Sequence, residues 1–378
     1  MNEQLAMREC TSTVNVARDW LKGMGDAAIS QNFSIQYCMT LPSITMNSAS
    51  IHASTHQRLG GDYLDGDNAN NWDIGSASIF IWGVGLLPFK DTFLSNGTQT
   101  PPTHANSGTG KGGFKGFHEQ APQLHAISAI LSTGPVSPSD GIGGADKGLL
   151  MSLCRADGLL LKPDKPARTV DAHWLSGVFN NTPGPQGRAL WTTSTSLSTM
   201  TAAAAAAVAT TGTTRTWGYV LVAESEAAWS GSAATLNLPG GANATSGVAW
   251  TRPKHSSVGT GEAARIIPAD ITLVPFTDAK PLLVPATGKD YGDFELIYTA
   301  PMLANGMVLL GEVAKVVAVS AARFTSVSAA TAGTIDLELA GVLGEHVEVY
   351  YVGSGGTTAK SASCVMGSSG SCALKLLA

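Results

Sequence analysis

The stretch HAISAILSTGPVSPSDGIGGADKGLLMSLCRADGLLLK, residues His125–Lys162, decides the fold class, because helical and strand-like patterns alternate within it. Its opening segment has the spacing of a buried helix. The segment Gly134–Asp140 then predicts a short strand that ends at an acid. A second helix is predicted over Lys147–Arg155, where the leucines lie on one side. Helices that alternate with strands favour a parallel α/β sheet or part of a barrel.

The same alternation runs through the sequence upstream of this stretch. The pattern predicts a helix over residues 11–30 and a short buried strand over Phe33–Met39. It also predicts a packed helix over Ile74–Leu87, which ends at Pro88. We therefore expect an α/β domain at residues 1–168, with polar residues after its strands, where α/β folds place active sites.

The second half of the sequence has a different pattern. Strand-like runs such as TWGYVLVAES and HVEVYYVG are separated by Gly, Pro and Asp, which is typical of a β-sandwich. We expect this domain at residues 169–378. A low-complexity segment near 192–216 predicts a surface loop with one helical turn at its alanine run. Cys364 and Cys372 flank a turn-like segment, and the sequence leaves open whether they form a disulfide.

The composition narrows the classes of partner and the cellular compartments that we expect for this protein. Charged residues make up 13% of the 378 residues, the net charge is −5, and Lys and Arg form no cluster, so nucleic acid is not an expected partner. No apolar run has the length of a membrane span. Residues 1–20 lack a signal-peptide pattern, so the compartment stays open with the cytoplasm slightly favoured. The five cysteines match no metal spacing, and we expect neither a metal nor a cofactor.

The loop STHQRLGGDYLDGDNANNW, Ser54–Trp72, carries the sharpest candidates for chemistry. Asp62 near a strand end, close to an arginine and aromatic residues, is a candidate general acid. The alternative for Asp62 is an exposed acid in a polar loop. Arg58 is suited to hold a substrate hydroxyl or orient a carboxylate, or else to form a surface ion pair. Trp72 is suited to stack on a sugar, or else to pack under the loop.

Two further acids lie at comparable places in successive α/β units. Asp91 follows Pro88 at a predicted strand end, and Asp140 ends the segment GPVSPSD. Acids at these places can face one pocket. The alternative is that either acid caps the next helix. A pair formed by Asp62 and Asp140 also keeps open an unrelated α/β enzyme.

Together these segments resemble glycoside hydrolase family 36, in particular its raffinose synthase and alkaline α-galactosidase branch. The longest match is the stretch His125–Lys162. The segment YCM at Tyr37–Met39 resembles the family's Cys-Met strand, and RLGGDY at Arg58–Tyr63 resembles its Arg-x-x-Asp-Asp-aromatic motif. LPFKDTF at Leu87–Phe93 resembles its Gln-Pro-Asp-Trp-Asp-x-Phe segment.

The resemblance implies a (β/α)₈ TIM barrel followed by an antiparallel β-sandwich, and cleavage or transfer of α-linked galactose with retention of configuration. Two carboxylates do this work, one as nucleophile and one as acid/base. Residues 1–168 would hold barrel strands five to eight, and the expected partner is a carbohydrate of the α-galactoside type. The resemblance makes Asp62 the acid/base. From the residue types and their places in the α/β units we expect four substrate-binding residues: Arg58, Trp72, Asp91 and Asp140.

The sequence departs from the family at several positions. Gly61 replaces the first Asp of the Asp-Asp pair, and Phe89 and Lys90 replace an Asp and a Trp, so galactose need not be the sugar. The family's nucleophile lies in a Lys-x-Asp context on barrel strand four, whereas KPD at Lys162–Asp164 lies beyond the last barrel helix. We therefore expect an N-terminally truncated chain that lacks the nucleophile. The alternative is a non-catalytic carbohydrate-binding or degenerate structural relative.

Overall fold

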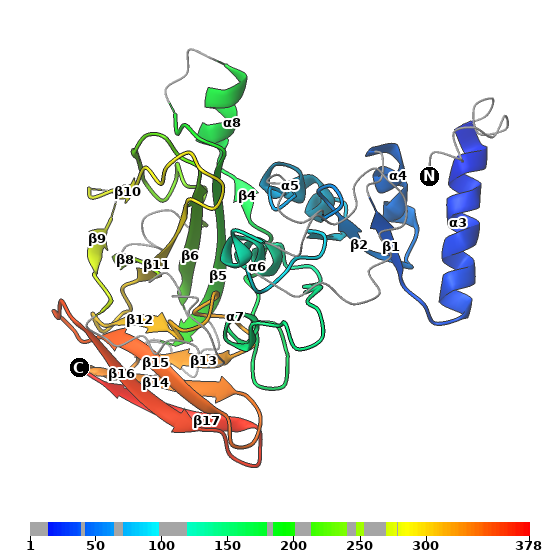
Figure 1. Cartoon of the computed structure of the whole chain (residues 1–378). Helices are drawn as coiled ribbons and strands as arrows, with labels where there is room; N and C mark the ends of the chain where they lie inside the picture. The colour runs from blue at the N-terminus through cyan, green and yellow to red at the C-terminus, as the bar shows by residue number, and fades with distance from the viewer. Residues whose placement is uncertain are drawn as a thin grey trace.

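A computed structural model describes most of the chain. It covers residues 14–38, 42–63, 71–97, 119–179, 184–200, 213–239, 247–252, 270–277 and 279–378. In Figure 1 the helices and short strands of the N-terminal half lie on one side, and long strands dominate the other side. The predicted order, α/β followed by a β-rich half, is confirmed at this level.

The N-terminal half is built from five helices around a small sheet, within the described residues. The helices are α3 (Val14–Ser30), α4 (Pro42–Asn47), α5 (Gly75–Gly83), α6 (Pro122–Leu131) and α7 (Lys147–Met151). The strands are β1 (Ile35–Cys38), β2 (Ser54–Arg58) and β3 (Leu87–Phe89). They pair in the order β1-β2-β3, and both pairings are parallel. The predicted parallel α/β arrangement is therefore present in this half.

Several predicted elements of this half differ in the structure. The segment Ser54–Trp72, expected as a loop, begins with strand β2 at Ser54–Arg58. The expected helix over Ile74–Leu87 stops at Gly83, because Gly85 takes φ +89° and turns the chain into β3. The expected strand over Gly134–Asp140 is reduced to one parallel bridge between Phe93 and Pro138. Proline has no backbone N–H to donate to a ladder, and this segment contains two prolines, which limits its pairing.

The C-terminal half consists of one short helix and many strands. These elements are β4 (Arg168–Thr169), α8 (Asp171–Val178), β5 (Ala189–Met200), β6 (Thr213–Ala223), β7 (Trp229–Gly231), β8 (Gly247–Thr251), β9 (Val274–Phe276), β10 (Leu282–Val284), β11 (Phe294–Pro301), β12 (Val308–Gly311), β13 (Phe324–Ser328), β14 (Thr334–Ala340), β15 (His346–Val352), β16 (Ala359–Val365) and β17 (Ser371–Leu377). A nine-stranded sheet runs in the order β17-β14-β13-β5-β6-β11-β8-β9, with β4 also on β5. A three-stranded sheet, β12-β15-β16, and the pair β10-β7 complete it.

The low-complexity segment near 192–216 is not a surface loop in its described parts. β5 and β6 pair with each other along their full lengths, and the N-terminal part of β5 is buried. Threonine is β-branched and favours strands. Two of the buried hydroxyls find backbone acceptors, since Thr192 Oγ1 donates to Leu236 O at 2.7 Å and Thr199 Oγ1 to Thr213 O at 2.7 Å. The alanine run lies outside the described residues.

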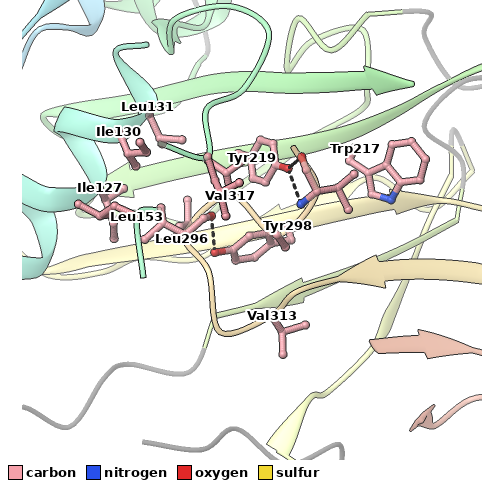
Figure 2. Packing of buried hydrophobic residues seen from close by; sticks show 14 of the residues in the cluster. Ile127, Ile130, Leu131, Leu153, Trp217, Tyr219, Leu296, Tyr298, Val313 and Val317 are labelled. Atoms are coloured by element: carbon pink, nitrogen blue, oxygen red, sulfur yellow. Dashed lines mark hydrogen bonds between the residues drawn. The ribbon is translucent and has the colours of Figure 1, made fainter. Parts of the chain in front are cut away.

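One hydrophobic core joins the two halves across the expected boundary at 168/169. Figure 2 shows Ile127 and Leu131 of α6 beside Leu296 of β11, and all three belong to the same buried cluster. The hydroxyls of the buried tyrosines there donate to backbone oxygens, Tyr219 Oη to Val319 O at 2.6 Å and Tyr298 Oη to Val316 O at 2.9 Å. The position of α6 is thus fixed from both halves, which matters for the site described below.

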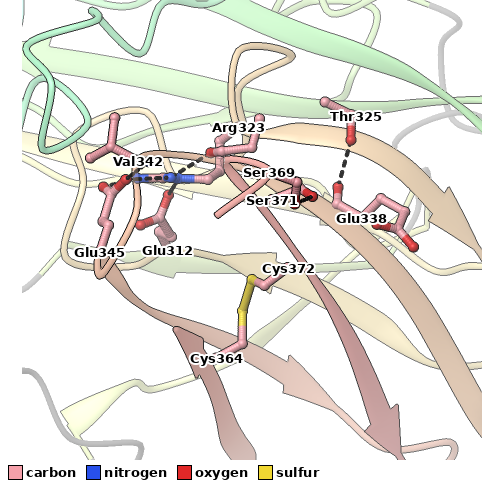
Figure 3. The surroundings of a disulfide bond; sticks show 11 residues. Glu312, Arg323, Thr325, Glu338, Val342, Glu345, Cys364, Ser369, Ser371 and Cys372 are labelled. Carbon is pink, nitrogen blue, oxygen red and sulfur yellow. Dashed lines mark hydrogen bonds and ion pairs between the residues drawn. A yellow bond between two sulfur atoms is a disulfide. The ribbon is translucent and has the colours of Figure 1, made fainter. Parts of the chain in front are cut away.

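A disulfide and a buried group of ion pairs connect elements of the C-terminal half. Cys364 and Cys372 form a disulfide between β16 and β17, which answers the question that the sequence left open (Figure 3). Beside it, the buried Arg323 pairs with Glu312 and Glu345.

Within the described residues no three or more His, Cys, Asp and Glu side chains are grouped so as to hold a metal ion. No helix of the described part is long and apolar enough to cross a membrane.

Candidate functional site

The candidate site lies at the carboxyl edge of the sheet β1-β2-β3. The register places Cys38, Arg58 and Phe89 side by side at the ends of the three strands. Asp62 and Asp91 follow shortly after β2 and β3 in the chain. Open parallel sheets bind ligands at this edge because all strands direct their following loops there. The fold therefore brings together acids that the sequence separates.

Arg58 is the centre of an ion-pair group. Its side chain is 9% exposed, with Nη2 2.6 Å from Asp62 Oδ1 and Nη1 3.1 Å from Asp91 Oδ2. Burial alone would lower the pKa of Arg58, but the hydrogen bond to Asp62 and the charge of Asp91 raise it above its usual value. Arg58 thus forms ion pairs with two carboxylates, and its role toward a substrate stays a prediction.

Asp62 and Asp91 differ in their access to solvent. The Asp62 side chain is 65% exposed, whereas that of Asp91 is 18% exposed. Asp91 Oδ2 also accepts a hydrogen bond from the Tyr63 backbone N–H at 2.6 Å. Gly60, with φ +63°, makes the turn between Arg58 and Asp62. Asp62 is therefore held at the surface of a fixed loop, while Asp91 acts as an anchor of that loop.

Trp72 does not present its ring to a ligand. The residue is 0% exposed, and its ring centroid lies 5.4 Å from that of Trp191 in β5. The guanidinium carbon of Arg188 lies 5.4 Å from the same ring. The expectation that Trp72 binds substrate is wrong for this structure, and the alternative of packing under the loop describes it. The cause is the β-rich half, which covers the indole.

Asp140 joins two loops after the bridge between Phe93 and Pro138. Its carboxylate accepts hydrogen bonds from Ser95 N at 2.8 Å and from Ser95 Oγ at 2.7 Å. The cap of α7 is a different acid, Asp146, which accepts from Leu149 N at 2.9 Å. In the structure Asp62 and Asp91 therefore both form ion pairs with Arg58. Asp140 instead forms hydrogen bonds with Ser95.

Beneath the loop lies a buried polar group that the sequence did not reveal. Glu119 is 2% exposed, and it accepts hydrogen bonds from Tyr63 Oη and Tyr291 Oη, each at 2.7 Å. His125 Nε2 lies 2.6 Å from Tyr291 Oη and 3.3 Å from Glu119 Oε2. Burial and the charge of Lys90 hold the pKa of His125 well below its usual value. The sequence pattern places His125 on a buried helix but assigns it no role. It could not predict the contact of Glu119 with Tyr291, because the two residues are far apart in the chain.

Lys90 occupies a similarly unusual place. It is 1% exposed, and its Nζ donates to Asp91 O and Thr92 O, each at 2.7 Å. The ammonium also lies 5.4 Å from the ring centroid of Tyr63 and 5.2 Å from that of Phe93. Burial lowers the pKa of Lys90 to about 7, against the opposing charges of Asp91 and Glu119.

Replacing Lys90 by methionine is expected to remove a pH-dependent part of the stability. Folding lowers the pKa of Lys90 from 10.5 to about 7, so between these values the unfolded chain binds more protons. The free energy of unfolding then rises with pH through Lys90, by at most about 1.4 kcal/mol per pH unit. Denaturant unfolding of both proteins should show a difference that is constant below about pH 7 and grows in favour of the wild type above it. A difference that stays flat through this range would show that Lys90 does not titrate there.

Comparison with known proteins adds no name to this geometry. No protein-family model matches the chain, and a search of the curated proteins finds no match.

Proposed function

We propose that this chain belongs to an α-galactosidase-like or galactosyl-transferring glycoside hydrolase of the family 36 type, and that Asp62 is its acid/base. The observation that carries the proposal is an exposed carboxylate at the carboxyl end of a parallel strand, fixed by the buried Arg58 at 2.6 Å. The spacing from Arg58 to Asp62 is that of the resembling motif.

Asp62 acts twice in the proposed reaction. As the glycosidic C–O bond breaks, the proton of the Asp62 carboxyl moves to the leaving oxygen, and the sugar bonds to a nucleophilic carboxylate. Asp62 then accepts a proton from water while the water oxygen bonds to the sugar and the nucleophile leaves. Arg58 and Asp91 hold the loop that carries this acid, as the contacts of Arg58 indicate.

The proposal takes the nucleophile from outside this sequence. The Lys-x-Asp of the chain, Lys162–Asp164, follows α7, and Asp164 Oδ2 accepts from Ser196 N at 2.7 Å. The backbone N–H of Asp164 also donates to Ser194 O at 3.0 Å. Asp164 therefore ties the connection between the halves to β5. In this proposal β1, β2, β3 and the Pro138 bridge are barrel strands five to eight, and the β-rich half is the family's sandwich.

A second candidate is a carbohydrate-binding relative without catalysis. The observation that favours it is Lys90, which stands where the resembling motif has a tryptophan and lies buried under the loop. A buried ammonium cannot stack on a sugar as an indole does. Gly61 likewise replaces an acid of the motif.

Turnover of a panel of aryl glycosides by the protein as isolated from its source separates these candidates. The proposal expects release of the aryl alcohol from α-galactosides and none from β-galactosides, because a retaining site is shaped for one anomer. Calorimetric binding of an α-galactoside without turnover would favour the binding relative. Absence of both turnover and binding would contradict both candidates.

A further inference from the structure

We propose that Glu119 is a positioning residue for residues 59–63, called here the Asp62 loop, and that it acts through Tyr63. Tyr291 of the β-rich half completes this support. The catalytic consequence rests on the proposed function of Asp62, whereas the support itself is a property of the fold. The inference makes the β-rich half part of the site, although Tyr291 and Glu119 are 172 residues apart in the chain.

Tyr63 is fixed at both of its ends. Its backbone N–H donates to Asp91 Oδ2 at 2.6 Å, and its hydroxyl donates to Glu119 Oε2 at 2.7 Å. The Leu94 backbone N–H also donates to the Tyr63 hydroxyl, at 3.3 Å. Asp62 is the neighbour of Tyr63 in the chain, so the position of its backbone follows that of Tyr63. The side chain of Asp62 is exposed and is held by Arg58 from the other side.

Glu119 is suited to anchor this loop because it is itself held on both oxygens. Oε1 accepts from Tyr291 Oη at 2.7 Å and from the Ala121 backbone N–H at 2.8 Å. Oε2 accepts from Tyr63 Oη at 2.7 Å and lies 3.3 Å from His125 Nε2. A carboxylate with 2% exposure needs such donors, since an unpaired buried polar group is costly.

The hydrogen-bond directions form one consistent chain. Tyr291 Oη donates to Glu119, so the Nε2–H of a neutral His125 donates to Tyr291 Oη. His125 Nδ1 has no partner in the described structure, which fits a neutral ring with its proton on Nε2. The ring of His125 also meets that of Tyr63 edge to face, with centroids 5.5 Å apart. Tyr291 and His125 thus each contact Tyr63 or Glu119, which accepts the hydrogen bond of the Tyr63 hydroxyl.

The β-rich half reaches this cluster by a close backbone approach. Tyr291 lies in the turn before β11, a strand inside the nine-stranded sheet. A side chain at Gly292 would meet Ala121 Cβ at 3.1 Å, and Gly292 takes φ +92°. The turn therefore lies directly against the segment between Glu119 and α6, and a glycine allows it to do so. Figure 1 shows α6 beside the long strands of the sheet.

Amide hydrogen exchange of the full chain without substrate tests the support directly. The variants are Tyr63→Phe, Glu119→Gln and Tyr291→Phe. Each removes or reverses a hydrogen bond that Glu119 accepts from Tyr63 or Tyr291. We expect the peptide over residues 58–63 to exchange about tenfold faster in each, as the loss of one buried hydrogen bond allows. Peptides from α6 and β6 should keep their wild-type rates.

Two matched variants control for the chemistry of the substitutions. Tyr298→Phe removes a buried hydroxyl that donates to Val316 O, and Glu312→Gln neutralises a buried acid paired with Arg323. Neither residue belongs to the cluster around Glu119, so neither variant should change the 58–63 peptide selectively. Unchanged exchange in this peptide for Glu119→Gln or Tyr291→Phe would overturn the inference. Uniformly faster exchange in all peptides would also overturn it, because it would show only a loss of global stability.

Kinetics of the same variants give the second readout. If Asp62 is the acid/base, the positioning variants should lower kcat by about tenfold with little change in KM, since they misplace a group used in the transition state. A protein that turns over no glycoside would contradict the proposed function, and the exchange result would still decide the support. A rise in KM with unchanged kcat would contradict positioning by Glu119.

Discussion

If Asp62 is the acid/base, we expect Asp62→Asn to lower kcat/KM for phenyl α-galactoside by about a thousandfold, within the range known for loss of a general acid. The amide keeps the size of the carboxyl, and its oxygen can still accept the hydrogen bond that Arg58 donates at 2.6 Å in the wild type. The loop should therefore stay in place, because the contacts of Tyr63 with Asp91 and Glu119 are untouched. What the variant loses is the proton that the leaving oxygen needs. Steady-state kinetics on the purified variant measure the loss.

The control for this variant is Asp336→Asn. Asp336 lies in β14 and forms an exposed ion pair with Lys375 at 3.4 Å, far from any chemistry proposed here. Its replacement makes the same change of atoms and charge and should leave kcat/KM at the wild-type value. A loss of similar size in both variants would trace the effect to folding or charge. Wild-type activity in Asp62→Asn would remove Asp62 from the mechanism.

Arg323→Met lowers the free energy of unfolding by about 3–5 kcal/mol, the usual cost of removing one partner from a buried ion pair. The Arg323 side chain is fully buried, with Nε 2.7 Å from Glu312 Oε2 and Nη2 2.5 Å from Glu345 Oε1. Its Nη1 also donates to the backbone oxygen of Ala340. Methionine fills similar space but leaves two acids without their cation. Chemical denaturation followed by tryptophan fluorescence measures the change.

Two comparisons give this second prediction its specificity. Lys375→Met breaks the exposed pair with Asp336 and should cost less than about 1 kcal/mol. Adding Glu312→Gln and Glu345→Gln to Arg323→Met should recover part of the lost stability, because no uncompensated buried charge then remains. The buried group also matters for the contact between the halves, since Glu345 Oε1 accepts from the Ala156 backbone N–H at 3.0 Å. A cost below about 1 kcal/mol for Arg323→Met would contradict this account.

Local patterns in the sequence predict much of the N-terminal half. The spacing of apolar residues predicts α3 and α6, because the residues that form one face of a helix recur within a few turns of the sequence. The nearness of Arg58 and Asp62 is local as well, since the two residues are four positions apart in the chain. Asp91 joins them only through the parallel register of β2 and β3, a step that the α/β pattern allows.

Features that depend on distant partners could not be predicted in this way. β5 and β6 contain the Ser/Thr-rich segment that composition alone assigns to a loop, and their pairing supplies what the sequence pattern lacks. Trp72 is buried because Trp191 of the other half covers it. Glu119 and Tyr291 meet through the packing of the two halves. None of these contacts has a local signal, because each joins segments that only the tertiary fold brings together.

The dependence of Asp62→Asn on the leaving group tests the central claim most directly. The measurement compares kcat/KM of wild type and variant for phenyl and dinitrophenyl α-galactosides, which differ in the acidity of the departing alcohol. A general acid matters only when the leaving oxygen needs a proton, so the account predicts a loss of about a thousandfold for the phenyl substrate and almost none for the dinitrophenyl substrate. An equal loss for both substrates would contradict the account, because Asp62 would then act on binding or folding and not on proton transfer.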